Sequence, residues 1–400
     1  MTTQDSITKA IEAYVAAEEV AGAAALVWRN GAVAQLATVG WRDREAGLPV
    51  ERDTLFRIAS MTKPITSLAA LIVLEEKGIG LDTPIASVAP EFAAMRVLRA
   101  PGGPLDQTDP AARPITFDDL LTHRSGLTYG GVYPGPLSDA YAQALGGDID
   151  SPVKPDDWIA GLAALPLIAQ PGTAFNYGYS TDLLGQLIAR IDGAPLGEVL
   201  KRRVFEPLGM KDTGFTAPAD RRATLYGCDE TGRLVRRLTA AGGSTLPERP
   251  ADMEYCSGGQ GLWSTLDDYL AFARLFIGEG PQLLRPQTLK LMTTNRLTDD
   301  QRLGAQMFGM PTFGTGHGFG LGLATVIDPA TASYTRGKGG IGTVSWPGAF
   351  GGWWQADPTD GSVMIFLVHN IMEPALMAQG IGLNVYGLIA QVHALGSAKA

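Results

Sequence analysis

The sequence of 400 residues has few of the residues on which metal centres and disulfide frameworks are built. Its two cysteines, Cys228 and Cys256, are too few for a disulfide framework and fit a reducing compartment. The four histidines are scattered, and no His-x-x-x-His or Cys-x-x-Cys pair offers the usual ligand spacing of zinc. The composition therefore predicts a cytoplasmic protein that works without a metal.

Long apolar runs and nucleotide-binding loops are also missing. No segment reaches the roughly 18 consecutive apolar residues of a membrane-spanning helix, and the first residues lack the basic and apolar regions of a signal peptide. The Gly-rich run 337–340 matches neither a Walker loop nor a dinucleotide fingerprint, and the absence of Gly-x-Ser-x-Gly argues against an α/β-hydrolase. A net charge of −9 argues against nucleic acid or an anionic membrane as a partner.

Three Ser-x-x-Lys patterns are present, at residues 6–9, 60–63 and 151–154. The first lies in a polar segment and the third in a Pro/Asp-rich loop, whereas Ser60 comes directly before an apolar helix predicted over residues 61–77. One helical turn brings Ser60 and Lys63 onto the same face, where an unprotonated lysine can take the serine proton. The alternative, that Ser60 only caps the helix, stays open at this point.

Tyr177 is a second candidate for proton transfer. It precedes a helix predicted over residues 181–191, and Gly178 permits an unusual backbone angle beside it. A tyrosine near a lysine can serve as a general base or proton shuttle. A packing role for Tyr177 is the alternative.

Residues 342–351 form a third segment of interest, in which glycines flank Trp346. This pattern predicts a bulged edge strand or a stretch of backbone that a ligand approaches closely. An edge strand with free N–H groups would be a natural oxyanion donor. The alternative is a Gly-rich loop that covers a hydrophobic corner.

The order of the predicted elements indicates an α+β fold. Asn30-Gly31 predicts a tight turn between two strands near the N-terminus, and residues 81–214 contain only short helices and long loops. The remaining elements are helices over residues 5–19 and 375–395 and strands over residues 23–28, 32–40, 322–328, 352–355 and 362–369. We expect an antiparallel sheet built from both termini and flanked by helices, with an inserted, mostly helical lobe.

This organisation predicts two domains. Residues 1–80 plus 215–400 would form a discontinuous α/β domain, and residues 81–214 a helical domain. We expect the active site in the cleft between them.

Several motifs in this order carry a family resemblance that covers nearly the whole chain. The chain resembles the class C β-lactamase and penicillin-binding-protein type of serine hydrolase, and within it most closely the family VIII carboxylesterases. The motifs are Ser-Met-Thr-Lys at 60–63, Leu-Leu-Thr-His-Arg-Ser-Gly-Leu at 120–127, Pro-Leu-Gly-Met at 207–210 and Ser-Gly-Gly-Gln-Gly-Leu at 257–262. The resemblance implies a β-lactamase/transpeptidase-like fold.

The resemblance also implies roles for single residues. Ser60 matches the acylated serine, Lys63 its motif partner and Tyr177 the tyrosine of the Tyr-x-Asn or Tyr-Ser element. The main-chain N–H groups of Ser60 and Ala349 match the oxyanion hole. The implied substrate-binding residues are Tyr129, Tyr133, Tyr179, Trp346, Gly348 and Phe350. Neither a metal nor an organic cofactor is needed, and whether Lys63 or Tyr177 is the base stays open. We expect His123 to have a structural role and the glycines at 257–261 to pack tightly.

Departures from the β-lactamase pattern favour an ester as the small-molecule substrate. Trp346-Pro347-Gly348 stands where β-lactamases usually have Lys-Thr-Gly, although Lys338-Gly339-Gly340 offers a competing alignment. We therefore expect cleavage of short-chain carboxylic esters. The alternatives are a β-lactamase, a D-amino-acid peptidase or amidase, an acyltransferase with the same site, or a binding protein without activity.

Overall fold

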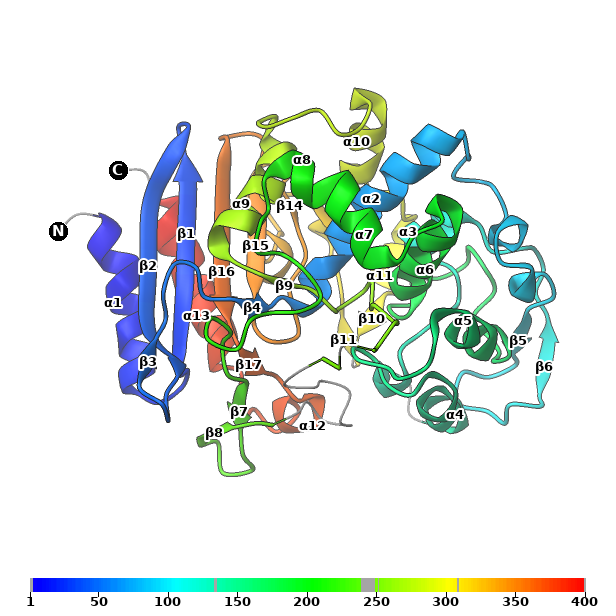
Figure 1. The fold of residues 1–400 in the computed structure, drawn as a ribbon, viewed down its shortest axis with the longest axis horizontal. Coiled ribbons are helices and arrows are strands. Elements are labelled where there is room, and N and C mark those ends of the chain that lie inside the picture. The colour runs from blue at the N-terminus through cyan, green and yellow to red at the C-terminus, as the bar shows by residue number, and fades with distance from the viewer. Residues whose placement is uncertain (1–2, 133–134, 239–248, 251, 308, 399–400) are drawn as a thin grey trace.

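An eight-stranded sheet built from both ends of the chain forms the centre of the fold (Figure 1). We analysed a computed structural model, which describes residues 3–132, 135–238, 249–250, 252–307 and 309–398. Neighbouring strands of the sheet pair antiparallel. Their spatial order is β12 (His317–Phe319), β13 (Ala324–Val326), β14 (Val344–Ser345), β15 (Trp353–Asp357), β16 (Ser362–Val368), β1 (Gly22–Arg29), β2 (Ala32–Asp43) and β3 (Leu48–Pro49). The predicted sheet of strands from both termini is confirmed.

The hairpin between β1 and β2 follows the sequence signal. Asn30 and Gly31 have φ angles of 54° and 75°, which is the left-handed backbone that a tight hairpin turn requires and that these two residue types tolerate. On its other side β1 pairs with β16, with Ala23 opposite Val368. The first and last long strands of the chain therefore lie side by side.

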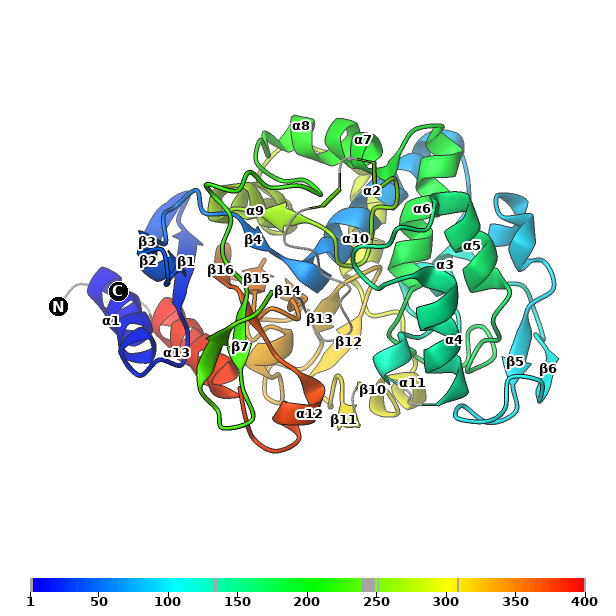
Figure 2. The same cartoon turned by 60° about the horizontal axis from the view of Figure 1, so that its bottom comes forward.

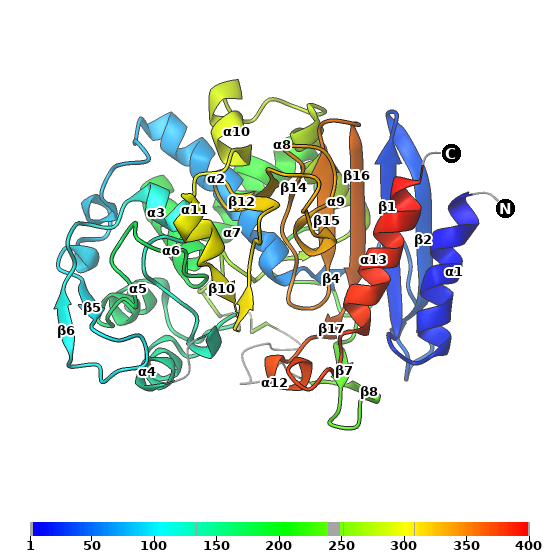
Figure 3. The ribbon, with the colours of Figure 1, turned by 180° about the vertical axis from the view of Figure 1, so that it is seen from behind.

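Helices cover both faces of the sheet, so β1 is buried on both sides. Ala23, Ala25 and Val27 pack on α1 (Thr3–Ala16) and α13 (Asn384–Ser397), which lie next to each other in Figure 3. The alternate residues Ala24 and Leu26 belong to the larger core on the opposite face. This alternation is the period of two expected of a strand.

Helix α2 (Thr62–Lys77) is the central helix of the larger core. All of its residues from Thr62 to Leu74 are buried, as the apolar run predicted. Gly78 ends it in the left-handed conformation with φ 66°, the usual helix-terminating geometry of glycine. A helix buried this completely is a rigid platform for whatever its first residues carry.

The remaining helices lie on either side of α2, as Figure 2 shows. They are α3 (Phe117–Leu121), α4 (Pro136–Leu145), α5 (Pro155–Ala163), α6 (Ser180–Asp192), α7 (Leu196–Leu200), α8 (Glu206–Leu208), α9 (Leu266–Ala273), α10 (Pro286–Thr293), α11 (Asp299–Leu303) and α12 (Pro374–Met377). Short strand pairs complete the fold: β4 (Phe56–Arg57) with β9 (Trp263–Ser264), β5 (Arg96–Leu98) with β6 (Thr108–Pro110), β10 (Gln306–Met307) with β11 (Met310–Pro311), and β7 (Tyr226–Cys228) between β8 (Leu234–Arg236) and β17 (Asn370–Ile371). The division into domains 1–80 plus 215–400 and 81–214 stays a prediction.

Two expectations about single elements are wrong. β14 lies between β13 and β15 inside the sheet, so the segment around Trp346 does not begin as an edge strand. The predicted helix over 375–395 is two helices, α12 and α13, separated by a stretch in which Gly380 and Gly382 have φ angles of 81° and 78°. Left-handed backbone of this kind interrupts a right-handed helix.

Neither cysteine is in a disulfide, and both Cys228 and Cys256 are free thiols. Among the residues that the structure describes, no helix has the length and apolarity needed to cross a membrane.

Candidate active site

Ser60 lies in a single 3-10 turn, Ala59–Met61, that leads into α2. Ala59 has a φ of 44°, a left-handed conformation that costs energy for a residue with a Cβ and is often found at functional sites. The helix cap is Met61, and no side chain caps α2. Capping is therefore not the role of Ser60, and its hydroxyl is available for other contacts.

The Ser60 hydroxyl lies between the two predicted proton-transfer groups. Its Oγ is 3.4 Å from Lys63 Nζ and 2.6 Å from the Tyr177 hydroxyl. Ser60 is 6% exposed and Lys63 is fully buried. The structure thus brings Ser60, Lys63 and Tyr177 into one hydrogen-bonded cluster, in which Ser60 and Tyr177 are each 6% exposed and Lys63 is not exposed.

Lys63 is held by two further oxygens that the sequence did not suggest. Its Nζ donates to the Tyr129 hydroxyl and to the Gly259 carbonyl, each at 3.0 Å. The Tyr129 hydroxyl in turn donates to Asp182 Oδ2 at 2.7 Å. Burial and the charge of Asp182 hold the pKa of Tyr129 well above its ordinary value, so this phenol stays protonated and connects lysine to carboxylate.

Asp182 is the functional candidate that sequence reasoning missed. It is fully buried in the first turn of α6, and its Oδ1 accepts hydrogen bonds from the Ser257 hydroxyl and from Gly259 N–H at 3.0 Å. An acidic residue in the first turn is common in helices because it complements the dipole, so position alone gave no signal. Its role can be recognised only in the folded structure, where α6 brings Asp182 next to Tyr129 and Gly259.

The glycines of residues 257–261 pack tightly, as predicted. A Cβ on Gly258 would lie 2.8 Å from the Thr181 carbonyl oxygen and 3.1 Å from Thr66 Cγ2. The segment therefore fits between α2 and α6 only without side chains at this point. Close packing also presents the Gly259 carbonyl to Lys63.

Trp346 lies against Tyr177 and donates its indole N–H to the Tyr177 hydroxyl at 3.3 Å. The competing Lys338 is exposed, and its carbonyl lies 2.8 Å from His393 Nε2 on α13. Trp346, and not Lys338, is thus the residue next to the site.

Gly178 is required for a different reason from the one predicted. Its φ is not among the positive values, so no unusual backbone angle is involved. Instead, a Cβ at this position would lie 2.2 Å from Thr128 Cα. The glycine lets the backbone beside Tyr177 run close to the backbone beside Tyr129.

The segment at Gly348–Phe350 runs along the backbone that precedes Ser60. A Cβ on Gly348 would lie 2.4 Å from the Ile58 carbonyl oxygen, and Phe350 packs on Ala59 in one buried cluster. Within the described residues no hydrogen bond engages the N–H of Ser60 or of Ala349. These two groups as an oxyanion hole remain a prediction, as does a substrate contact of Gly348 or Phe350.

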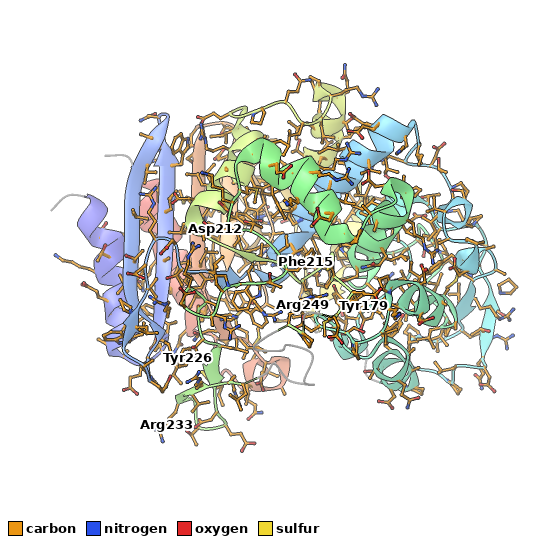
Figure 4. The ribbon with its side chains drawn as sticks, in the orientation of Figure 1. Tyr179, Asp212, Phe215, Tyr226, Arg233 and Arg249 are labelled. Atoms are coloured by element: carbon orange, nitrogen blue, oxygen red, sulfur yellow. The ribbon has the colours of Figure 1, made fainter. Side chains whose placement is uncertain are left out.

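The tyrosines expected to bind substrate lie in different surroundings. Tyr179 is 2% exposed and donates to Asp148. Its ring stacks edge-on against Tyr129, Tyr141 and Trp158, which places it beside α4 and α5 (Figure 4). Tyr133 lies outside the described residues.

His123 is fully buried, with Nε2 3.3 Å from Thr181 Oγ1 and its ring centroid 5.0 Å from that of Tyr177. Burial, together with the charge of Lys63, holds the pKa of His123 well below its ordinary value. The ring is therefore neutral and packs between aromatic side chains. This environment agrees with a structural role.

The described residues contain no group of three or more His, Cys, Asp or Glu side chains that could hold a metal ion. Two cavities of about 170 and 190 Å³ share Arg57, Arg222 and Trp263 in their walls. Neither has Ser60 in its wall.

Comparison with known proteins places this chain in a family. A β-lactamase family model matches residues 7–379. Protein Rv1367c of Mycobacterium tuberculosis (strain ATCC 25618 / H37Rv) is 44% identical over 358 residues, 88% of this chain and 86% of that protein. Esterase EstB of Burkholderia gladioli is 32% identical over 364 residues, with coverage of 88% and 86%. The structure of EstCE1, described as a hydrolase with promiscuous acyltransferase activity, superposes with a TM-score of 0.79 at 26% identity and covers 98% of each chain.

We predict that Asp182→Asn slows the reaction of Ser60 with a fluorophosphonate on the order of 10- to 100-fold, because displacing a reacting group by about 1 Å costs this much. The amide cannot accept from Tyr129, Ser257 and Gly259 at once, so the contacts that position Lys63 are lost. Asp268→Asn is the matched control, since Asp268 is also buried and accepts from Thr213 and from the Asp212 N–H, each at 2.8 Å. Equal labelling rates in the two variants would contradict a positioning role.

We predict that His123→Asn weakens the dependence of stability on acid pH. The folded protein holds His123 at a lowered pKa, whereas the unfolded chain takes up a proton below about 6.5. The contribution is therefore complete above that pH and is lost as the pH falls below it. Asparagine tolerates the positive φ of 53° at this position. The drop in melting temperature between pH 7 and pH 5 should be smaller in the variant; an unchanged drop would show that His123 titrates normally.

Proposed function

Because the chain belongs to the β-lactamase family, we propose that it is a serine esterase that cleaves short-chain carboxylic esters through an acyl-enzyme on Ser60. The observation that supports this most directly is the contact of one serine hydroxyl with Lys63 at 3.4 Å and Tyr177 at 2.6 Å. A nucleophile within reach of a proton acceptor is the requirement for covalent catalysis.

In the acylation step the Ser60 hydroxyl loses its proton to the Lys63–Tyr177 pair, and Oγ attacks the ester carbonyl carbon. The N–H groups of Ser60 and Ala349 would bind the oxyanion that forms on the carbonyl oxygen. The carbon–oxygen bond to the alcohol then breaks, and the alcohol leaves with the proton. Which member of the pair takes the proton first is a property of the coupled pair.

Deacylation uses the same groups with water in place of the alcohol. The pair removes a proton from water, the hydroxide attacks the acyl carbon, and Ser60 leaves as the protonated hydroxyl. The buried contacts of Lys63 with Tyr129 and Gly259 hold its ammonium or amine group in place through both steps. No group from outside the chain is required.

An ester is favoured over a β-lactam by the residues next to Tyr177. Trp346 and Pro347 offer neither the charge nor the hydroxyl that a Lys-Thr-Gly segment would supply. The proposed contact area of Trp346, Phe350 and Tyr129 is aromatic and suits short acyl chains. EstB is named as an esterase, which supports the same choice.

Transfer of the acyl group to another alcohol is the second candidate. EstCE1 is described as having promiscuous acyltransferase activity, and the acyl-enzyme on Ser60 would be common to both reactions. Amidase, D-amino-acid peptidase and β-lactamase activities would also use this serine. A binding protein without activity would leave Ser60 unreactive.

We predict that Ser60→Ala lowers ester hydrolysis by at least about 100-fold, since loss of a covalent nucleophile typically costs orders of magnitude. The small side chain fits the 3-10 turn, so the melting temperature should hardly change. Ser151→Ala is the control, because Ser151 belongs to another Ser-x-x-Lys pattern. A fluorophosphonate should label the peptide that contains Ser60 in the wild type and in the control. Residual hydrolysis above about a hundredth in Ser60→Ala would rule out this serine as the nucleophile.

We predict a higher kcat/KM for p-nitrophenyl butyrate than for nitrocefin in the same buffer. The ester needs only the nucleophile and an apolar surface, whereas the lactam lacks its usual polar partners beside Trp346. Steady-state rates with both substrates on one enzyme preparation give the ratio. An equal or higher value for nitrocefin would favour the β-lactamase alternative and leave the roles of Ser60 and Lys63 in place.

A further inference from the structure

Arg336 brings a positive charge next to the proposed site, and no negative group among the described residues pairs with it. It ends a 3-10 turn, Tyr334–Arg336, and its guanidinium carbon lies 4.9 Å from the ring centroid of Trp346. Its only side-chain hydrogen bond within the described residues is from Nη1 to the Thr335 carbonyl at 3.3 Å. The Nε atom is buried and has no hydrogen-bond partner there. The sequence patterns gave no indication that a charge reaches Trp346.

Arginines that stack on aromatic rings elsewhere in the described structure each have a carboxylate as well. Three such pairs show the usual arrangement: Arg44 over Tyr226 with Glu45 at 3.3 Å, Arg57 over Trp263 with Asp150 at 2.9 Å, and Arg274 over Trp28 with Glu279 at 2.7 Å. Arg336 has the ring but forms no ion pair with any described carboxylate. The missing element is therefore a negative group, and not the stacking surface.

An unpaired guanidinium in this position is unfavourable to the folded protein. Arg336 is half-buried, and the partial loss of water around its guanidinium lowers the pKa of this group. Stacking on Trp346 compensates only in part, because a ring quadrupole attracts a cation more weakly than an anion does. The planar fork of N–H donors is suited to a carboxylate, which it can bind through two parallel hydrogen bonds.

The position of Arg336 connects it to the chemistry. Trp346, on which it stacks, donates to the Tyr177 hydroxyl at 3.3 Å, and that hydroxyl lies 2.6 Å from Ser60 Oγ. A group bound at Arg336 would thus be separated from the nucleophile by the two side chains of Trp346 and Tyr177. Arg336 is therefore linked to Ser60 through two side chains that contact each other.

We propose that Arg336 recognises a carboxylate on the substrate, so that the preferred substrate is a short-chain ester that also carries an acid group. This inference rests on the proposed esterase function and specifies its substrate class. The net charge of −9 gives the chain no long-range attraction for anions, so recognition would depend on the local contact with Arg336. The acid group can belong to the acyl part or to the alcohol part of the ester.

Two matched substrate pairs distinguish a carboxylate on the acyl part of the ester from one on the alcohol part. Mono-4-nitrophenyl glutarate and 4-nitrophenyl pentanoate have the same acyl length and differ in the acid at its end. The second pair is 4-acetoxybenzoate and methyl 4-acetoxybenzoate, in which the acid is on the alcohol part. The rate without enzyme is subtracted, because the glutarate carboxylate can attack its own ester.

The variants are Arg336→Gln, which removes the charge, and Arg336→Lys, which keeps the charge without the planar fork. We expect the wild type to have a higher kcat/KM for the acidic member of at least one pair. In Arg336→Gln this ratio should fall about tenfold or more, as expected when a hydrogen bond to a charged group is lost. Arg336→Lys should give an intermediate ratio. Arg274→Gln, which also removes a stacked arginine, should leave the ratio unchanged.

The ratio of kcat/KM for the acidic member to that for the neutral member distinguishes recognition of a carboxylate by Arg336 from a packing role of this side chain. An equal loss for both members of each pair in Arg336→Gln would mean that the side chain only supports Trp346, and would overturn the inference. Ser60-dependent hydrolysis without any acid preference in the wild type would overturn it and leave the esterase function standing. Absence of ester hydrolysis together with an unlabelled Ser60 would overturn both.

Discussion

A fully buried lysine is the constraint on which the rest of the site depends. The three hydrogen-bonding positions of Lys63 Nζ meet three oxygens, those of Ser60, Tyr129 and the Gly259 carbonyl. A buried ammonium group with an unsatisfied donor is costly, so the elements that carry these oxygens have to meet at one point. The negative charge that balances Lys63 is on Asp182, which is connected to the lysine through the Tyr129 hydroxyl.

This requirement explains the close packing around α2. The segment that supplies the Gly259 carbonyl also donates its N–H to Asp182, and a Cβ on Gly259 would lie 2.4 Å from the Asp182 Oδ2 atom. Helices α2 and α6 are therefore held at a distance that only a glycine backbone can fill. On the other side of Ser60, Gly348 approaches the Ile58 carbonyl in the same manner. Ser60, the proposed nucleophile, is positioned by backbone contacts on both sides.

The two positively charged side chains at the proposed site, Lys63 and Arg336, differ in their partners. Lys63 is connected to Asp182 through the Tyr129 hydroxyl, which forms a hydrogen bond with each of them. Neither charged group is therefore isolated. Arg336 stacks on the ring of Trp346 and donates a hydrogen bond to the Thr335 carbonyl, but it forms no ion pair with any described carboxylate. A site that combines one satisfied cation with one unsatisfied cation is suited to hold a proton-transfer group steady and to bind a negative group at the same time.

The sequence by itself determined the local elements and the proximity of Ser60 to Lys63. The Asn30-Gly31 turn, the buried helix α2 and the one-turn spacing of Ser60 and Lys63 all follow from short-range chemistry, namely backbone preference, apolar periodicity and helix geometry. The interior position of β14, the close contact behind Gly178, and the roles of Asp182 and Gly259 were decided by the tertiary structure. Each of these depends on which distant segment lies opposite, and local patterns carry no record of that partner. Arg336 shows this most clearly, because only the fold reveals that it stacks on Trp346 while no described carboxylate lies beside it.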